Sequence, residues 1–371
     1  MGYTGQRSRG IAVRRLHSLL TSDDATSLRE IAKHLRELAE SFDKPEHIIQ
    51  VSTDTSDTDP LIVIAVDGGE NLICPQAREV AIGLIRVGAF SPDAEKLSQP
   101  LPNPFEVCIK GFRLLSPDRK HDRDHVKTYL ESLLESHETL KKFLKLTGIT
   151  LADLGTYYQR DITSLVTTIR DIAEWSFLVH LADQYKETNV LIVKDGRLAQ
   201  VGVKKEFRNK LLQFFQSNRT RLVGVVKASK LMGDQLAVRL LLRWLDCHPV
   251  PIAIRVPDAL MEYVYTTSRQ WHPEEGKSLV LGRRYLLRFR KKEFIPLESA
   301  IAFDVPSYLE KDKRTLQQVI TTLYKHRSAL YGGSVAPIVR AHDTASVADA
   351  SIRHLERELW ELVEREVFGH G

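Results

Sequence analysis

Two stretches of this sequence share one pattern, an unbroken apolar run that stops at Asp-Gly. The first is Leu61-Ile-Val-Ile-Ala-Val-Asp67-Gly-Gly69, and the second is Asn189-Val-Leu-Ile-Val-Lys-Asp195-Gly-Arg-Leu198. Runs rich in β-branched residues are typical of strands that are covered on both faces of a sheet. The glycines after each Asp allow a sharp turn and leave room for a ligand. A turn that merely closes a core strand explains the first stretch alone more simply.

The remaining segments predict a chain in which strands and helices are mixed. Apolar residues in 79–90 and 105–115 indicate two strands after the first run, which favours an antiparallel meander with Asp67 on its first strand. Helical spacing covers 122–186 with a break near Gly148, and then 204–215, 316–331 and a last helix from Ala336 to about Val367. Further strands are expected at 221–227 and between 283 and 305. The fold class is therefore α/β.

Three polar residues outside the Asp-Gly runs are candidates for a site. Glu174 has apolar neighbours one helical turn on, so it is either paired, with Arg170 as the partner, or functional. Lys227 ends the strand at 221–227 and either contacts a phosphate and balances the acids or is simply solvated. His342 lies among apolar residues and is either a ligand or a capped core histidine.

The two Asp-Gly runs and Glu174 together favour a metal site. Two strands that end side by side would bring Asp67 and Asp195 together, with Glu174 delivered from the helix between them. Oxygen ligands suit a hard cation, Mg²⁺ or Mn²⁺, and an added imidazole from His342 favours Mn²⁺. Cys74, Cys108 and Cys247 have no zinc-binding spacing. An odd cysteine count indicates a reducing cytosol.

The charge pattern permits a polyanionic partner. The chain has 371 residues and a formal net charge of +5. The run Arg284-Tyr-Leu-Leu-Arg-Phe-Arg-Lys-Lys292 places basic residues on one face of a strand, which suits either a nucleic-acid backbone or a solvated sheet edge. No signal peptide and no apolar run of about 20 residues is present. We therefore expect a cytoplasmic protein that makes no contact with a membrane.

The order and spacing of these short motifs resemble the NurA family of DNA-repair nucleases over residues 60 to about 350. The matching pieces are Val66-Asp67-Gly68, Glu174, Val193 to Leu198, Val223 to Lys227, Ile295 to Glu298, and Pro337 to His342. The sequence departs from the family at Gly69, where the family often has Ser. The resemblance implies a ribonuclease-H-like mixed sheet with an antiparallel meander, flanked by helices and with helical additions at both ends.

The resemblance also implies an activity and its residues. It implies a deoxyribonuclease that depends on Mn²⁺, with Mg²⁺ as the alternative, and that acts on single-stranded DNA as a 5′-end exonuclease and an endonuclease in processing double-strand breaks. The catalytic residues carried over are Asp67, Glu174, Asp195, Lys227 and His342, of which all but Lys227 would bind metal. His342 rather than Asp343 is aligned with the family histidine.

Partners and domains follow from the same resemblance. It implies a homodimer that works with a HerA-type hexameric ATPase. The expected domains are a helical extension at 1–50, the nuclease domain at 51–350, and a C-terminal helix at 351–371 packed on that domain. The helices between Leu16 and Leu38 either pack on the main domain or meet the partner. The alternatives are a non-catalytic DNA-binding or ATPase-docking subunit of the same fold, and an RNA-directed nuclease.

Overall fold

A computed structural model describes most of the chain from residue 48 onwards. The described residues are 48–51, 61–73, 82–109, 120–159, 162–198, 203–226, 248–257, 282–289, 300–328, 334–346 and 349–369, with Lys33, Glu37, Leu241 and Leu245. Lys227 and the helices expected between Leu16 and Leu38 thus fall outside them, apart from Lys33 and Glu37. The division of the chain into three domains therefore stays a prediction.

Nine strands among the described residues form one sheet, in the order β1-β7-β8-β9-β6-β5-β2-β3-β4. Their bounds are β1 Ile48–Gln50, β2 Ile62–Ile73, β3 Ile82–Phe90, β4 Phe105–Ile109, β5 Val190–Asp195, β6 Arg221–Val226, β7 Ile252–Arg255, β8 Gly282–Arg288 and β9 Ala300–Pro306. Strands β2, β3 and β4 are an antiparallel meander, and β5 lies parallel between β2 and β6. The ribonuclease-H-like mixed sheet with a meander is thereby confirmed.

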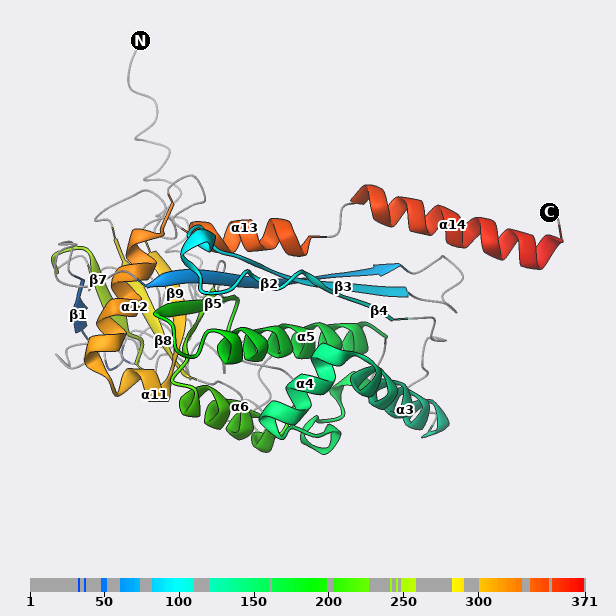
Figure 1. Ribbon diagram of the computed structural model, residues 1–371, viewed down its shortest axis with the longest axis horizontal. Helices are drawn as coiled ribbons and strands as arrows, with labels where there is room; N and C mark the ends of the chain where they lie inside the picture. The colour runs from blue at the N-terminus through cyan, green and yellow to red at the C-terminus, as the bar shows by residue number, and fades with distance from the viewer. Residues whose placement is uncertain are drawn as a thin grey trace, which may run out of the picture.

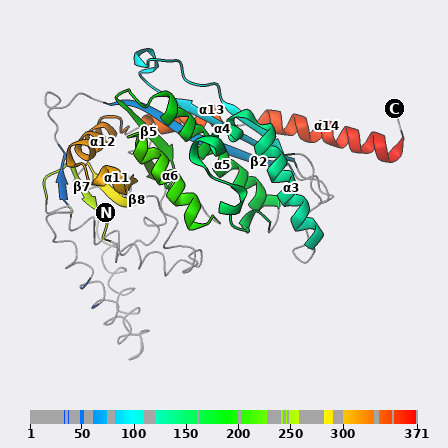
Figure 2. The same ribbon diagram turned by 60° about the horizontal axis from the view of Figure 1, so that its bottom comes forward.

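Helices cover both faces of this sheet (Figure 1). Their bounds are α3 Lys120–Ser136, α4 Glu138–Thr147, α5 Ile162–Gln184, α6 Lys205–Ser217, α11 Ser307–Glu310, α12 Lys313–Lys325, α13 Ala336–Ala345 and α14 Asp349–Phe368, with short 3-10 turns at Ala94–Lys96, Leu151–Asp153 and Tyr157–Gln159. Helices α3 to α6 lie together on the side of the meander opposite α13, and α14 projects past the sheet (Figures 1 and 2). No helix in the described part of the chain is long and apolar enough to span a bilayer.

Alternation along the central strands divides the apolar core in two. Ile64 and Val66 of β2 pack in the cluster that includes α5, whereas Val63 and Ala65 pack in the cluster that includes α12 and α13. The same alternation in β5 directs Ile192 toward the α5 side and Val193 toward the α13 side. Each central strand is thus covered on both faces, which explains its unbroken apolar sequence.

The expected end of the first strand at Asp-Gly is wrong. β2 continues through Asp67, Gly68 and Gly69 to Ile73 and pairs there with β3 alone. The two glycines of β2 do not turn the chain. Gly68 leaves room for Glu174 on one face of the sheet, and Gly69 leaves room for Ala345 on the other. Only the second Asp-Gly is a turn, because Gly196 has a φ of 86°.

The basic strand is neither a DNA-binding face nor a solvated edge within its described part. β8 lies between β7 and β9, and the side chains of Arg284 and Arg288 are buried, with residue exposures of 2% and 3%. Arg284 pairs with Asp304 of β9. The alternation of residues in this strand therefore separates two buried faces, one of which holds an ion pair.

Candidate metal site

Asp67 and Asp195 come together because two parallel strands reach the same point of the sheet. The pairing of β2 with β5 ends at Val66 opposite Lys194, so Asp67 and Asp195 are the next residues of each strand. By the alternation of the two strands, both side chains face the α13 side. Beyond this point β2 no longer pairs with β5, which opens the sheet beside the two carboxylates.

His342 reaches Asp67 from α13, which packs closely on the meander at two glycines. A Cβ added at Gly69 would overlap the carbonyl oxygen of Ala345, and one added at Gly88 would lie 2.5 Å from Thr344 Oγ1. The close packing leaves His342 Nδ1 2.6 Å from Asp67 Oδ2. This contact holds the imidazole ring directly against the Asp67 carboxylate.

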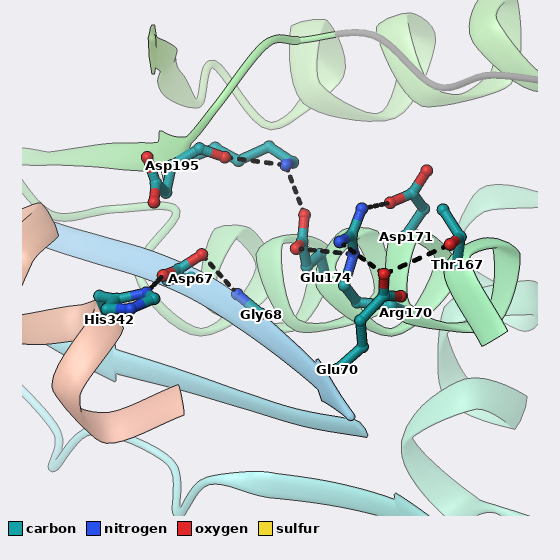
Figure 3. A network of polar contacts seen from close by, with 10 residues as sticks. Asp67, Gly68, Glu70, Thr167, Arg170, Asp171, Glu174, Asp195 and His342 are labelled. Atoms are coloured by element: carbon teal, nitrogen blue, oxygen red, sulfur yellow. Dashed lines mark hydrogen bonds and ion pairs between the residues drawn. The ribbon is translucent and has the colours of Figure 1, made fainter. Parts of the chain in front are cut away.

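Three ligand atoms are therefore close enough to share one ion (Figure 3). Asp67, Asp195 and His342 each offer one atom, and these atoms lie within 4.8 Å of one another. The Asp67 side chain is 9% exposed and that of His342 is 59% exposed, so the cluster is buried on the sheet side and open on the helix side. Two carboxylates and an imidazole are donors that Mn²⁺ accepts. The donor set and its spacing fit a divalent cation.

Glu174 lies on the other face of the sheet, against Gly68. A Cβ at Gly68 would stand 2.5 Å from Glu174 Oε1, so the glycine is what admits this carboxylate. Glu174 is 4% exposed and forms an ion pair with Lys194, whose Nζ also donates to the carbonyl oxygen of Asp195 at 3.0 Å. Lys194 therefore links Glu174 to the backbone of a candidate ligand.

For both Glu174 and Lys194, burial and the ion pair shift the pKa in opposite directions. Burial raises the pKa of Glu174 to about 7, although the Lys194 ammonium opposes the rise. Burial acts to lower the pKa of Lys194, but the attraction of Glu174 outweighs it and leaves this pKa above its ordinary value. Lys194 thus stays protonated, while burial and the nearby Asp171 hold the pKa of Glu174 above its ordinary value.

Arg170 binds the remaining acids on the α5 side (Figure 3). Its guanidinium lies 3.3 Å from Glu70, 2.9 Å from Asp171 and 3.7 Å from Glu174. Thr167 Oγ1 also donates to Glu70, at 3.3 Å. The partner expected for Glu174 is thus present at a longer distance, and Lys194 is the nearer one. A lysine one residue before Asp195 was the available sequence signal for this pairing.

The structure thus groups the proposed residues in two sets. Asp67, Asp195 and His342 form one cluster, and Glu174 lies on the opposite face with Lys194. Asp343, the alternative to His342, is 61% exposed at its side chain and lies 3.7 Å from Arg340.

Fold and cluster together define an α/β protein with a mixed nine-stranded sheet and a candidate divalent-metal site where β2 and β5 separate. Neither a protein-family model nor a curated protein matches the chain. Solved structures do. The NurA nuclease from Sulfolobus solfataricus is similar over 95% of this chain and 98% of that chain, with a TM-score of 0.43 and 11% identity.

Two further solved structures are similar to this chain. NurA bound to dAMP and manganese covers 95% of this chain and 96% of its own, with a TM-score of 0.36 and 12% identity. Argonaute from Marinitoga piezophila, in complex with guide RNA and target DNA, covers 78% of this chain and 30% of its own, with a TM-score of 0.24 and 11% identity.

Proposed function

We propose that this protein is a divalent-metal-dependent nuclease that hydrolyses phosphodiester bonds of DNA. The observation that carries the proposal is the convergence of Asp67, Asp195 and His342 on one point of the sheet. Two carboxylates placed together repel each other unless a cation lies between them. The His342 imidazole supplies part of that compensation by its hydrogen bond to Asp67, and a metal ion would supply the rest.

Each residue has a definite task in this proposal. Asp67, Asp195 and His342 hold the ion, and Mn²⁺ is favoured over Mg²⁺ because one ligand is an imidazole. When bound, the ion supplies Lewis-acid polarisation of the phosphate and lowers the pKa of an attacking water. The family resemblance would also make Glu174 a ligand, whereas in this structure it lies on the opposite face of the sheet, paired with Lys194. Lys227 would neutralise charge on the phosphoryl oxygens.

The substrate and partners rest on the resemblance of the sequence motifs to the NurA family. They are single-stranded DNA ends, cut by 5′-end exonuclease and endonuclease action in the processing of double-strand breaks. A homodimer and a HerA-type ATPase partner belong to the same proposal, as does a cytoplasmic location. The net charge of +5 agrees with a polyanionic substrate.

Cleavage of end-labelled single-stranded DNA with Mn²⁺, Mg²⁺ or EDTA tests the proposal. Asp67→Asn and Asp195→Asn each remove one anionic ligand, so we expect cleavage to fall by about 100-fold, which corresponds to roughly 3 kcal/mol of transition-state stabilisation. Asp343→Asn is the matched control, because this exposed acid is one residue from His342 and points to Arg340 instead. Glu174→Gln asks whether the third carboxylate is a ligand.

Mn²⁺ binding is measured by the loss of the EPR signal of the free ion. This measurement tests the metal site independently of DNA cleavage. Tight binding that Asp67→Asn and Asp195→Asn abolish, together with metal-dependent cleavage, would establish the nuclease. Folded protein that binds DNA but cleaves it under none of these metals would refute it. That outcome would favour the non-catalytic DNA-binding or ATPase-docking subunit, whereas cleavage of RNA alone would favour the RNA-directed enzyme.

A further inference from the structure

A buried ion pair joins strands β8 and β9, beyond the meander and the two parallel strands β5 and β6. Asp304 of β9 is fully buried and Arg284 of β8 is 2% exposed. Arg284 binds both carboxylate oxygens, with Nε donating to Oδ1 and Nη2 donating to Oδ2 at 3.1 Å. Burial of two charges costs several kcal/mol per ion before their attraction offsets it. Apolar side chains of the same size would have held the two strands together without that cost.

Asp304 has a second partner, which belongs to the turn after Asp195. The backbone N–H of Leu198 donates to Asp304 Oδ2 at 3.1 Å. The turn starts at Gly196, whose N–H donates to the carbonyl oxygen of Val225 at 2.7 Å. The segment from Asp195 to Leu198 is therefore fixed near its start by β6 and at its end by the Asp304 carboxylate.

Gly224 of β6 lets this turn lie directly on the sheet. Gly224 pairs with Lys194 on one side and with Asp304 on the other. An added Cβ would stand 2.6 Å from the carbonyl oxygen of Gly196 and 2.9 Å from the N–H nitrogen of Leu198. The turn thus crosses the bare backbone of β6 and ends on the next strand, at Asp304.

We propose that Asp304 is a positioning residue of the candidate metal site, held in place by Arg284. Its carboxylate fixes the end of the turn that Asp195 opens, and so fixes the direction of the Asp195 side chain toward Asp67 and His342. Arg284 neutralises the carboxylate, so Asp304 acts through the backbone of Leu198 and not as a ligand. This inference rests on the proposed function, because it concerns the same metal ion.

The test replaces the pair by apolar side chains of similar size, Asp304→Leu with Arg284→Met. Such replacements often leave stability unchanged, because the desolvation cost disappears with the attraction. The N–H of Leu198 nevertheless loses its acceptor. We expect the apparent Mn²⁺ dissociation constant, measured by EPR, to rise about tenfold. Cleavage at saturating Mn²⁺ should return toward the wild-type rate, since the ligands themselves are intact.

The matched control is Asp153→Leu with Lys210→Met. The Asp153 carboxylate also has two such partners. Lys210 Nζ lies 2.7 Å from Asp153 Oδ2, and the backbone N–H of Thr150 donates to the same oxygen at 2.7 Å. It contacts neither the turn nor the ligands in any described interaction, so this control should leave Mn²⁺ affinity unchanged. A loss of affinity of equal size in the control would overturn the inference, because the effect would then be general.

Gly224→Ala tests the same inference without touching the ion pair and decides the matter if the double variant does not fold. Its Cβ must displace the turn at Gly196 and Leu198, so Mn²⁺ affinity should again fall. Wild-type affinity in a folded form of either variant would overturn the inference while leaving the proposed function standing. If the wild-type protein shows no Mn²⁺ binding that Asp67→Asn weakens, both the inference and the proposed function would be refuted.

Discussion

At the scale of single residues, the candidate site shows how a sheet separates like charges. Asp67 and Asp195 share one face with His342, whereas Glu174 lies on the other face with Lys194. Three carboxylates in one cavity would raise one another's pKa. Here one of them is paired with a buried lysine, and the other two remain next to an imidazole. The strand backbone thus keeps two charge clusters apart over a short distance.

Asp153 offers a pH test of a carboxylate that is far from this chemistry. Burial acts to raise the pKa of Asp153, but hydrogen bonds from Lys210 and Thr150 outweigh it and hold the pKa below its ordinary value. A carboxyl whose pKa is lower in the folded state contributes stability above its unfolded pKa of about 4, and loses it as pH falls through the folded pKa. The contribution is therefore present at neutral pH and lost in acid.

Asp153→Asn should accordingly lower the free energy of unfolding by about 1–2 kcal/mol at pH 7. Urea denaturation of wild type and variant at pH 7 and near pH 3 measures the difference. The two curves should approach each other in acid. A gap that stays constant with pH would mean that the lost interaction is not the ionised pair.

Sequence reasoning at this scale singled out the candidate ligands and Arg170, but not Lys194 or Asp304. Asp67, Asp195, Glu174 and His342 each stood out as polar residues in apolar surroundings. Lys194 and Asp304 did not, since a lysine before Asp195 and an acid near a strand end are common in exposed positions. Their burial depends on β9 pairing with β6 and on α5 lying under β5, contacts between segments far apart in the sequence.

At the scale of elements, two glycines of the meander allow α13 to pack directly on the backbone of the strands. Gly69 of β2 and Gly88 of β3 both face it, and an added Cβ at either position would collide with the helix. The obstacle at Gly69 is the carbonyl oxygen of Ala345, which cannot rotate away as a side chain can. The helix itself would have to move, and His342 would move with it.

Gly69→Ala should therefore weaken both the fold and the site. We expect a loss of about 1–3 kcal/mol in the free energy of unfolding, as for overpacking in a core, together with weaker Mn²⁺ binding. Gly83→Ala is the comparison, because its Cβ would meet Val166 Cγ2 of α5 at 2.7 Å, on the face of the sheet away from α13. Equal Mn²⁺ affinity in the two variants, measured by EPR titration, would contradict this role for α13.

Element boundaries show where local pattern was sufficient and where it was not. The meander, α5 and the break at Gly148 followed from apolar spacing, and Gly148 ends α4 with a φ of 66°. The single helix expected from Ala336 to Val367 is wrong, because α13 ends at Ala345 and α14 starts at Asp349. No proline or glycine marks that break. The helical periodicity continued, while the change from a buried to an exposed helix did not show in the sequence.

At the scale of the whole molecule, α14 contributes little to the described core. It contacts β2 and otherwise projects past the sheet (Figure 1). Leu355, Trp360 and Leu362 of this helix are 38%, 38% and 54% exposed. Its described ion pair between Arg357 and Glu361, at 3.9 Å, lies within the helix itself.

Removal of residues 347–371 should thus change the free energy of unfolding by less than about 0.5 kcal/mol, as for other surface changes. Mn²⁺ affinity should also be unchanged, because none of the candidate ligands lies in α14. Urea denaturation and EPR titration of the shortened chain measure the two quantities. A loss of several kcal/mol would show instead that α14 is packed on the domain, as the sequence suggested.

The order of synthesis gives the close contact between Asp67 and His342 a further meaning. These residues are 275 positions apart, and α13 follows every described strand of the sheet. Domains begin to fold while the chain is still being made, amino-terminal parts first. A nascent chain can therefore assemble the sheet with both aspartates in place and still lack the imidazole. Any chemistry that needs all three ligands is withheld until α13, the last helix of the described core, docks on the sheet.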